Sequence, residues 1–243
     1  MHGRHHNPAF GLHARYGQAF WRYTRGRMID RTDIPRPTVK RLSLYLREAE
    51  RRVAAGATNL SSRQLGDALD IADTQVRKDL GHFGQIGRSG IGYQAANLIN
   101  TLRTILGLNR EWPTILVGAG NIGRALLAYP AFLERGFQIL AAFDEQDEVV
   151  GQSIGGVEVH HIDNLLEFVK EHDVQIGVVA VPDEAAQEVA EQLVEAGVRG
   201  ILNFAPTRLH VPAGLVSVDL SRSLEMLAFQ VAGGLTGESS TDE

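Results

Sequence analysis

Hydrophobic and polar residues follow different patterns in the two parts of the chain. Between Val39 and Val53 the apolar residues recur at every third or fourth position, which is the spacing of one buried helix face. From Thr114 onward, short apolar runs alternate with longer amphipathic stretches, as expected for parallel strands that are joined by helices. The pattern predicts an N-terminal helical domain and a C-terminal α/β domain.

The N-terminal part is predicted to contain three helices in close succession. The first follows the pattern above and ends at Gly56. The sequence Ser61-Ser62-Arg63-Gln64 can form a capping box at the start of the second helix. Asp73 is expected to cap the third helix, which runs through Leu80. Because a tight turn joins the last two helices, their spacing predicts a helix-turn-helix.

A glycine-rich segment follows the third helix. Residues 83–93 have apolar residues on both sides of Arg88, which predicts a hairpin of two short strands with Arg88 near its tip. Such a hairpin makes the domain a winged helix. Residues 95–108 are predicted to form another amphipathic helix, followed by a domain boundary at 109–113.

The C-terminal part is predicted to be a Rossmann-type α/β domain. Strands are expected at 114–117, 137–143, 174–181, 200–204 and 216–218, and helices at 122–134, 185–196 and 221–232. His160, His161 and His210 are expected on loops, as surface residues.

A dinucleotide-binding motif lies between the first strand and the first helix of this domain. Gly118-Ala119-Gly120-Asn121-Ile122-Gly123 has the spacing that permits a tight turn, a close approach of the pyrophosphate and close helix packing. Asp144 ends the next strand, about 20 residues further on, where a carboxylate can bind both ribose hydroxyls. The motif predicts NAD(H) in preference to NADP(H). A domain without nucleotide, or one that binds coenzyme A, remains an alternative.

The sequence argues against a dehydrogenase. It contains only three lysines, Lys40, Lys78 and Lys170, and no Tyr-x-x-x-Lys pair. After the nucleotide fold, too little chain remains for a substrate domain. We therefore expect no catalytic residue and a cofactor that acts as a signal.

The charges are distributed unevenly along the chain. Residues 31–110 hold 13 basic and seven acidic residues, whereas residues 111–243 hold six basic and 21 acidic residues. Only the N-terminal part is therefore expected to approach a polyanion. The chain has no cysteine, and its apolar runs are too short for a membrane span, so we expect a cytoplasmic protein without thiol chemistry. Histidines near the N-terminus lack a fixed geometry, and no metal site is expected.

Polar side chains of the helix-turn-helix are candidates for DNA contacts. On the third helix, Arg77 and Lys78 suit guanine or phosphate, and Gln75 suits adenine. Arg88 on the wing suits a narrow minor groove. The second helix begins with three further candidates for phosphate contacts, which are Ser61, Ser62 and Arg63. Together they predict a DNA-binding domain.

These motifs resemble the Rex family of redox-sensing transcriptional repressors over about residues 35–235. The specific strings are Gln75-Val76-Arg77-Lys78-Asp79-Leu80 and Asn203-Phe204-Ala205-Pro206. The glycine motif and Val181-Pro182 also match, although the glycine motif alone is not specific to this family. The resemblance implies a homodimer that reads a palindromic operator, senses the NADH/NAD ratio and leaves the DNA when NADH binds. It also implies that the final helix is exchanged between subunits.

The resemblance further implies roles for individual residues. It adds Val181, Pro182, Asn203 and Phe204 to the nucleotide-binding candidates of the glycine motif and Asp144. It also implies a switch in which Asp219 pairs with one partner or another according to the bound nucleotide, and the switch residues are Arg47, Tyr129 and Asp219.

The expected organisation follows from these assignments. A flexible extension covers 1–34, the winged helix 35–94, a linker helix 95–112, the NAD(H)-binding domain 113–220, the dimerisation helix 221–235 and a disordered tail 236–243. A small NAD-dependent oxidoreductase and a coenzyme A-binding protein remain alternatives to the repressor.

Overall fold

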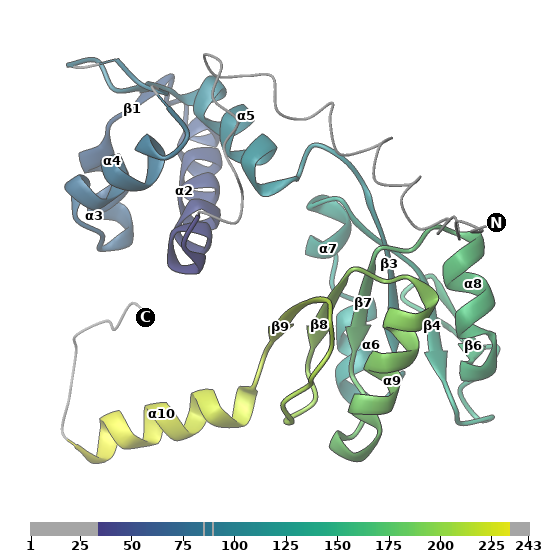
Figure 1. Cartoon of the computed structure of the whole chain (residues 1–243). Coiled ribbons are helices and arrows are strands. Elements are labelled where there is room, and N and C mark those ends of the chain that lie inside the picture. The colour runs from purple at the N-terminus through teal and green to yellow at the C-terminus, as the bar shows by residue number, and fades with distance from the viewer. Residues whose placement is uncertain (1–33, 85, 89, 234–243) are drawn as a thin grey trace, which may run out of the picture. The chain divides into compact units, whose positions relative to one another are not determined.

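The computed structural model describes residues 34–84, 86–88 and 90–233, and the chain divides into two compact units between Gly107 and Leu108 (Figure 1). The expected fold class, a helix-turn-helix followed by a parallel α/β sheet, is confirmed. Residues 1–33 of the expected extension, with their histidines, and the whole of the expected tail 236–243 lie outside the described residues.

The described residues of the first unit form four helices and two very short strands. In chain order these are α2 Arg36–Ala54, β1 Asn59–Leu60, α3 Ser62–Leu69, α4 Asp73–Gly81, β2 Tyr93–Gln94 and α5 Ala95–Leu106. Helix α5 packs along α2, and the core is formed by side chains with almost no exposed surface, among them Leu42, Tyr45, Leu46, Leu65, Val76, Leu98 and Leu102. Burial of these faces supplies the main driving force for folding of the unit.

The turn between α3 and α4 depends on a close approach of two backbone segments. Gly66 lies in α3, and a Cβ atom at this position would overlap the carbonyl oxygen of Ile71. The capping box is confirmed, but Asp73 does not cap α4. Ala72 is the N-cap residue, and Asp73 is the first helical residue, where its carboxylate pairs with Arg77 one turn later. Asp73 therefore lies within the first turn of α4, one position after the cap.

The wing is less regular than the sequence predicts. Arg88 and Gly92 form a single antiparallel bridge, in which the amide of each donates to the carbonyl of the other at 2.9 Å. Instead of extending the hairpin, β2 pairs with β1, which precedes the helix-turn-helix. Gly92 packs against the backbone of Leu60, so the returning arm of the wing is attached to β1.

The second unit contains a seven-stranded sheet of order β5-β6-β4-β3-β7-β8-β9, in which only β5 runs antiparallel to its neighbour. Its strands are β3 Trp112–Val117, β4 Phe137–Asp144, β5 Ser153–Ile154, β6 Val157–His161, β7 Ile176–Val179, β8 Gly200–Asn203 and β9 Gly214–Ser217. The helices are α6 Asn121–Leu127, α7 Ala131–Glu134, a 3₁₀ turn Ile162–Asn164, α8 Leu165–Glu171, α9 Asp183–Ala196 and α10 Leu220–Ala232.

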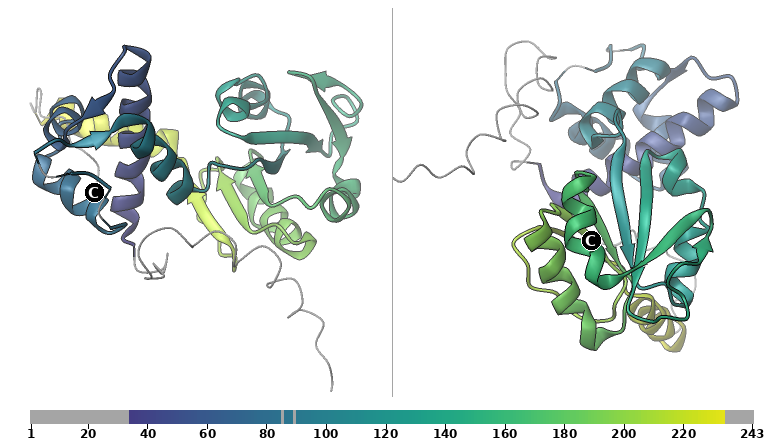
Figure 2. Two further views of the ribbon diagram at one scale, coloured as in Figure 1. Left: turned by 90° about the horizontal axis from the view of Figure 1, so that it is seen from above. Right: turned by 90° about the vertical axis from the view of Figure 1, so that its right-hand side faces the viewer.

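Helices cover both faces of this sheet, as Figures 1 and 2 show. On one face α8 and α9 pack on a core that includes Phe143, Leu165 and Leu193. On the other face Leu127 of α6 packs on Leu116, among the residues of a smaller core. The two cores enclose the strands and align the carboxyl ends of the parallel strands along one edge of the sheet.

Three sequence predictions for this unit are wrong in detail. The helix expected at 122–134 is broken into α6 and α7, because Pro130 lacks an amide hydrogen and disfavours helical backbone at Tyr129. Strands β5 and β6 and helix α8 were not expected. His160 and His161 therefore lie in β6 rather than on a loop, whereas His210 does lie outside the helices and strands.

The described residues form neither a metal-ligand cluster nor a membrane-spanning helix. No three His, Asp or Glu side chains among them come together as metal ligands would. Within the same residues, no helix is both long and apolar enough to cross a membrane.

Candidate DNA-binding and nucleotide-binding sites

A buried carboxylate attaches the third helix of the first unit, α4, to α2. Asp79 has no exposed surface, and its oxygens accept five hydrogen bonds from four side chains. Arg41 donates two of them, at 2.6 and 2.9 Å, and Tyr45 donates one at 2.8 Å. Thr38 and Gln75 supply the others. The position of α4 on α2 is thus set by a charged contact inside the domain.

These contacts keep Asp79 ionised. Burial by itself raises the pKa of the Asp79 carboxyl, but the hydrogen bonds from Arg41, Tyr45 and Gln75 and the charge of Arg41 more than offset this, so the pKa lies below its usual value. Burial and the hydrogen bond to Asp79 raise the pKa of Tyr45, so its hydroxyl remains a donor. An ionised carboxylate with paired oxygens is a stable centre for the helix contact.

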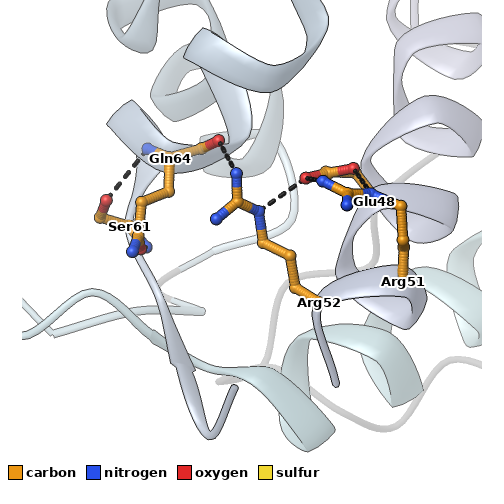
Figure 3. A network of polar contacts seen from close by, with 5 residues as sticks. All are labelled: Glu48, Arg51, Arg52, Ser61 and Gln64. Carbon is orange, nitrogen blue, oxygen red and sulfur yellow. Dashed lines mark hydrogen bonds and ion pairs between the residues drawn. The ribbon is translucent and has the colours of Figure 1, made fainter. Parts of the chain in front are cut away.

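A second polar network attaches α3 to α2 (Figure 3). Arg52 donates to Glu48 at 2.6 Å and to the carbonyl oxygen of Gln64 at 3.2 Å. Gln64 also belongs to the capping box, since the Ser61 hydroxyl accepts its amide at 3.1 Å and its side chain accepts the Ser61 amide at 2.8 Å. Arg51 completes the network by binding both oxygens of Glu48 at 2.7 Å. The start of α3 is therefore held in place from α2.

Four of the predicted DNA contacts meet in one groove. Ser61, Ser62, Arg77 and Arg88 line a groove of about 560 Å³ between the helix-turn-helix and the wing. Arg77 lies on the helix-turn-helix side of this groove, where its guanidinium joins α4 to α3 by donating to Ser62 at 3.1 Å as well as to Asp73 at 2.6 Å. The hydrogen bond from Arg77 lowers the pKa of Asp73.

The other three candidates lie outside the groove. Arg63 and Lys78 are exposed, at the start of α3 and in the middle of α4. Gln75 is only partly exposed, and its amide donates to Asp79 at 2.8 Å. Gln75 thus takes part in the attachment of α4 to α2, a contact that its position in the sequence did not indicate.

The second candidate site lies at the carboxyl edge of the parallel strands. The chain runs from β3 to β4 and β6 on one side, and then returns past β3 to β7, β8 and β9 on the other. Backbone hydrogen bonds of 2.8 Å join the ends of these strands, from Gly118 to Phe143 and from Ala180 to Val117. Ligands of open α/β sheets bind outside the carboxyl ends where the strand order reverses, which is here between β3 and β7.

The three glycines of the motif have different surroundings. Gly118 has a φ angle of +98°, and a Cβ atom there would press on the backbone of Ala180. A Cβ atom on Gly123 would overlap the carbonyl oxygen of Gly118. Gly120 in contrast has no heavy atom near its Cβ position, and it is exposed. Gly118 and Gly123 therefore serve the packing of the loop, and Gly120 leaves free backbone for a ligand.

Asp144 already contacts the glycine-rich loop. One carboxylate oxygen accepts the amide of Ala119 at 2.7 Å, and the other accepts the amide of Gln146 at 3.0 Å. The side chain is half-buried, and each oxygen retains capacity for another donor. Asn121 and Ile122 begin α6 beside it and are exposed. Asp144 and the loop thus form one preformed surface.

The remaining nucleotide-binding candidates follow β7 and β8. Val181 lies against Gly118 and Pro182 is the exposed N-cap residue of α9. Asn203 is fully buried, and its side chain exchanges hydrogen bonds with the backbone of Ala205 and Thr207. It shapes the loop after β8. Phe204 is half-buried and packs against the core on the α6 face of the sheet.

The residues assigned to a switch are distributed over both units. Arg47 lies exposed on α2, and Tyr129 lies at the break between α6 and α7, with an edge-to-face contact to Phe132. Asp219 is the N-cap of α10, where its side chain accepts the amide of Arg222 at 2.9 Å. In the described structure, the Asp219 carboxylate therefore has a helix amide as its partner.

Sequence reasoning missed the two buried acids of the first unit, Asp79 and Glu48. Both lie on the apolar face of their helices, since Asp79 comes three residues after Val76 and Glu48 comes three residues after Tyr45. An acidic residue that takes the place of an apolar one on the core-facing side of a helix is a signal for a buried ion pair. The basic partners of both acids, Arg41, Arg51 and Arg52, lie on α2.

Two family models match the chain. Residues 33–81 match the model described as "Putative DNA-binding protein N-terminus", and residues 109–207 match the model described as "CoA binding domain". The first match covers α2, α3 and α4, and the second covers the sheet with the glycine motif through the loop after β8.

Curated relatives and solved structures cover both units together. The redox-sensing transcriptional repressor Rex of Carboxydothermus hydrogenoformans is 47% identical over 82% of this chain and 96% of its own, and that of Pelotomaculum thermopropionicum is 44% identical over 82% and 94%. A crystal structure of RSP with β-NAD⁺ and operator DNA is 34% identical and superposes with a TM-score of 0.79 over 85% of this chain and 99% of its own. The structure of RSP with β-NADH is 33% identical and has a TM-score of 0.76 over 83% of this chain and 96% of its own. Another crystal structure of RSP describes it as a Rex-family repressor.

Proposed function

This chain belongs to the Rex family of redox-sensing transcriptional repressors, and we propose that it binds a palindromic operator as a homodimer and leaves the operator when NADH binds. The chain is a transcriptional regulator and not an enzyme. Its curated relatives are named transcriptional repressors. The observation that carries the proposal is the presence in one chain of a helix-turn-helix groove lined by Arg77 and a sheet edge with open backbone at Gly120.

The proposed ligand of the second unit is NAD(H). RSP, the neighbour in the solved structures, has been crystallised with both redox forms. The residues here fit that group, because Gly120 leaves room for the pyrophosphate and the Asp144 oxygens can each accept a ribose hydroxyl. An acid in this position repels a 2′-phosphate. When bound, the nucleotide supplies a redox signal through its nicotinamide ring, and the residues of this chain bind and orient it.

The proposed DNA contacts fall into two classes. Ser61, Ser62 and Arg63 at the start of α3 hold the phosphate backbone, and Arg77 and Lys78 of α4 reach base edges in the major groove. Arg88 on the wing reaches the minor groove. For Arg77, approach to a base or phosphate replaces its hydrogen bond to Ser62, which is exposed and therefore easily exchanged.

A second copy of the chain is proposed to cover α10. No residue of this helix is buried, and Leu220, Leu224, Leu227 and Val231 form an apolar stripe at intervals of three and four residues, each more than half exposed. Such a stripe is typical of a helix that packs on another surface. Asp219 at its start, with Arg47 and Tyr129, is the proposed switch, and the protein is proposed to act in the cytoplasm.

The test of the proposed function is a mobility-shift titration. The full chain is incubated with a duplex selected from a random pool, and NADH, NAD⁺, NADPH or coenzyme A is then added. We expect release of the duplex by NADH at concentrations where NADPH and coenzyme A have little effect. Unchanged affinity under NADH contradicts redox sensing, and release by coenzyme A alone supports the alternative ligand.

Arg77→Ala is expected to weaken binding to the selected duplex by about 1–3 kcal/mol, because a bidentate base contact is lost. Arg208→Ala is the matched control, since Arg208 is also exposed but lies in the acidic unit. Fluorescence anisotropy at several salt concentrations measures both variants. Equal losses in the two variants would show that only net charge matters and would remove Arg77 from the base-reading set.

Leu224→Ser with Leu227→Ser is expected to convert a dimer to a monomer, because it removes the centre of the apolar stripe of α10. The polar Glu225, between these two leucines, provides the control Glu225→Ala, which should remain dimeric. Sedimentation velocity distinguishes the two states. A double variant that sediments as the wild type does would place the subunit contact elsewhere.

A further inference from the structure

The contact between Gln75 and Asp79 joins an exposed face of α4 to its buried face. The two residues are one helical turn apart, and the Gln75 side-chain nitrogen donates to one Asp79 oxygen at 2.8 Å. Gln75 is partly exposed and follows the exposed Thr74 on the same helix, whereas Asp79 has no exposed surface. Gln75 therefore lies at the border of the surface that carries Lys78.

The chemistry of Asp79 decides which way the Gln75 amide faces. An ionised carboxylate can only accept hydrogen bonds, so the nitrogen of the amide and not its oxygen must face it. Arg41, Tyr45 and Thr38 hold the carboxylate in place, so it cannot turn to follow a rotating amide. The two orientations of the Gln75 amide, which are nearly equal in energy for a free side chain, are thereby reduced to one.

The fixed amide retains unused hydrogen-bonding capacity. One N–H of Gln75 is donated to Asp79, and no described residue of the chain donates to the side-chain oxygen of Gln75. One N–H and the oxygen remain. In the major groove, adenine offers the N7 acceptor and the N6 donor, which match these two groups. A rotated amide would offer the donor and the acceptor in exchanged positions.

We propose that Asp79 is a positioning residue for base recognition, which holds the Gln75 amide in the one orientation that reads adenine. This inference rests on the proposed DNA binding by α4 and adds to it the residue that sets specificity at one base pair of each half-site. Asp79 itself does not touch the DNA. It acts through Gln75, and the two hydrogen bonds from Arg41 give it the rigidity that this role requires.

The experiment selects duplexes from a random pool with the full-length wild type and three variants, followed by sequencing. Gln75→Ala removes the amide. Asp79→Asn replaces a group that can only accept hydrogen bonds with one that can turn either its oxygen or its nitrogen toward Gln75. Tyr45→Phe is the matched control, because it removes a different hydrogen bond from the same carboxylate. The readouts are the base preference at each position and the affinity for an unselected duplex.

We expect the wild type to favour adenine at one position of each half-site by at least about fivefold. Gln75→Ala and Asp79→Asn should both lower this preference by a larger factor than they lower the affinity for the unselected duplex. Tyr45→Phe should retain the preference. Full preference in Asp79→Asn overturns the positioning role, as does full preference in Gln75→Ala. If the wild type enriches no sequence, DNA reading itself fails, and this outcome is distinct from a loss confined to one position.

A measurement on the wild type covers the case in which Asp79→Asn does not fold. The Gln75 side-chain amide gives two proton resonances in NMR spectra, identified by their absence in Gln75→Ala. We expect the proton that faces Asp79 to exchange with solvent at least about tenfold more slowly than its partner, because it is held in a hydrogen bond to a buried carboxylate. Equal and rapid exchange of both protons would show a freely rotating amide and overturn the proposal.

Discussion

Asp79→Ala is expected to lower the free energy of unfolding of the N-terminal unit by about 3–5 kcal/mol, because it leaves the buried side of Arg41 and the Tyr45 hydroxyl without their acceptor. Hydrogen exchange followed by mass spectrometry measures this in the full chain, since peptides from α2 and α4 report on this unit alone. Tyr45→Phe removes only one of the five hydrogen bonds and should cost about 1 kcal/mol.

The effect of Asp79→Ala should also depend on pH. The pKa of Asp79 in the folded protein lies below the value of about 3.9 that an unfolded chain has, so the carboxylate contributes its full stabilisation above that pH. The contribution is lost as the pH falls through the lowered pKa. The difference between wild type and variant should therefore be constant near neutrality and shrink in acid. A difference that does not change down to the acid unfolding transition would show that packing, and not charge, holds α4.

Gly123→Ala and Gly120→Ala are expected to separate the two tasks of the glycine-rich loop. At Gly123 the new methyl group overlaps the Gly118 carbonyl, so α6 must move and the second unit should lose about 1–3 kcal/mol or more of stability. At Gly120 the methyl group meets no atom of the protein, so stability should remain. It does occupy the backbone face proposed for the pyrophosphate, and NADH affinity should fall by at least about tenfold.

Thermal unfolding and calorimetric titration with NADH measure both variants. The pair is informative because the substitution is chemically the same at the two positions. If Gly120→Ala binds NADH as tightly as the wild type, the pyrophosphate does not lie on this backbone. If Gly123→Ala is as stable as the wild type, the loop tolerates a displacement that its close packing does not suggest.

Local features of the fold could be predicted from the sequence where neighbouring residues determine them. The capping box of Ser61 and Gln64 and the tight turn at Gly118 depend on residues a few positions apart. The helix face from Val39 to Val53 follows from periodicity, but the expectation is wrong for Val39 and Val53 themselves, which lie at its ends and are exposed. Such features can be predicted because the local backbone has few alternative conformations.

Other features depend on contacts between distant segments and could not be predicted. Gln75 has the side chain of a base-reading residue, but its hydrogen bond to Asp79 emerges only when α4 lies on α2 and Arg41 fixes the carboxylate. In the same way, β2 would extend the wing hairpin if β1 were not beside it. Strand β6 was missed because its two histidines suggested a loop, whereas Val157 and Val159 alternate with polar residues as a strand requires.

The hydrogen bond between Asp144 and the amide of Ala119 bears on whether the sensor responds to the ratio of NADH to NAD⁺ or to the total nucleotide concentration. Gly120 and Asp144 are proposed to bind the pyrophosphate and the adenosine ribose, which NADH and NAD⁺ have in common, and the loop they share is already formed. Contacts to a common portion stabilise both complexes equally and cannot distinguish NADH from NAD⁺. They keep the site filled by one form or the other. The output then follows the ratio of the two forms and is insensitive to the total nucleotide concentration, because the difference between them is read only at the nicotinamide end.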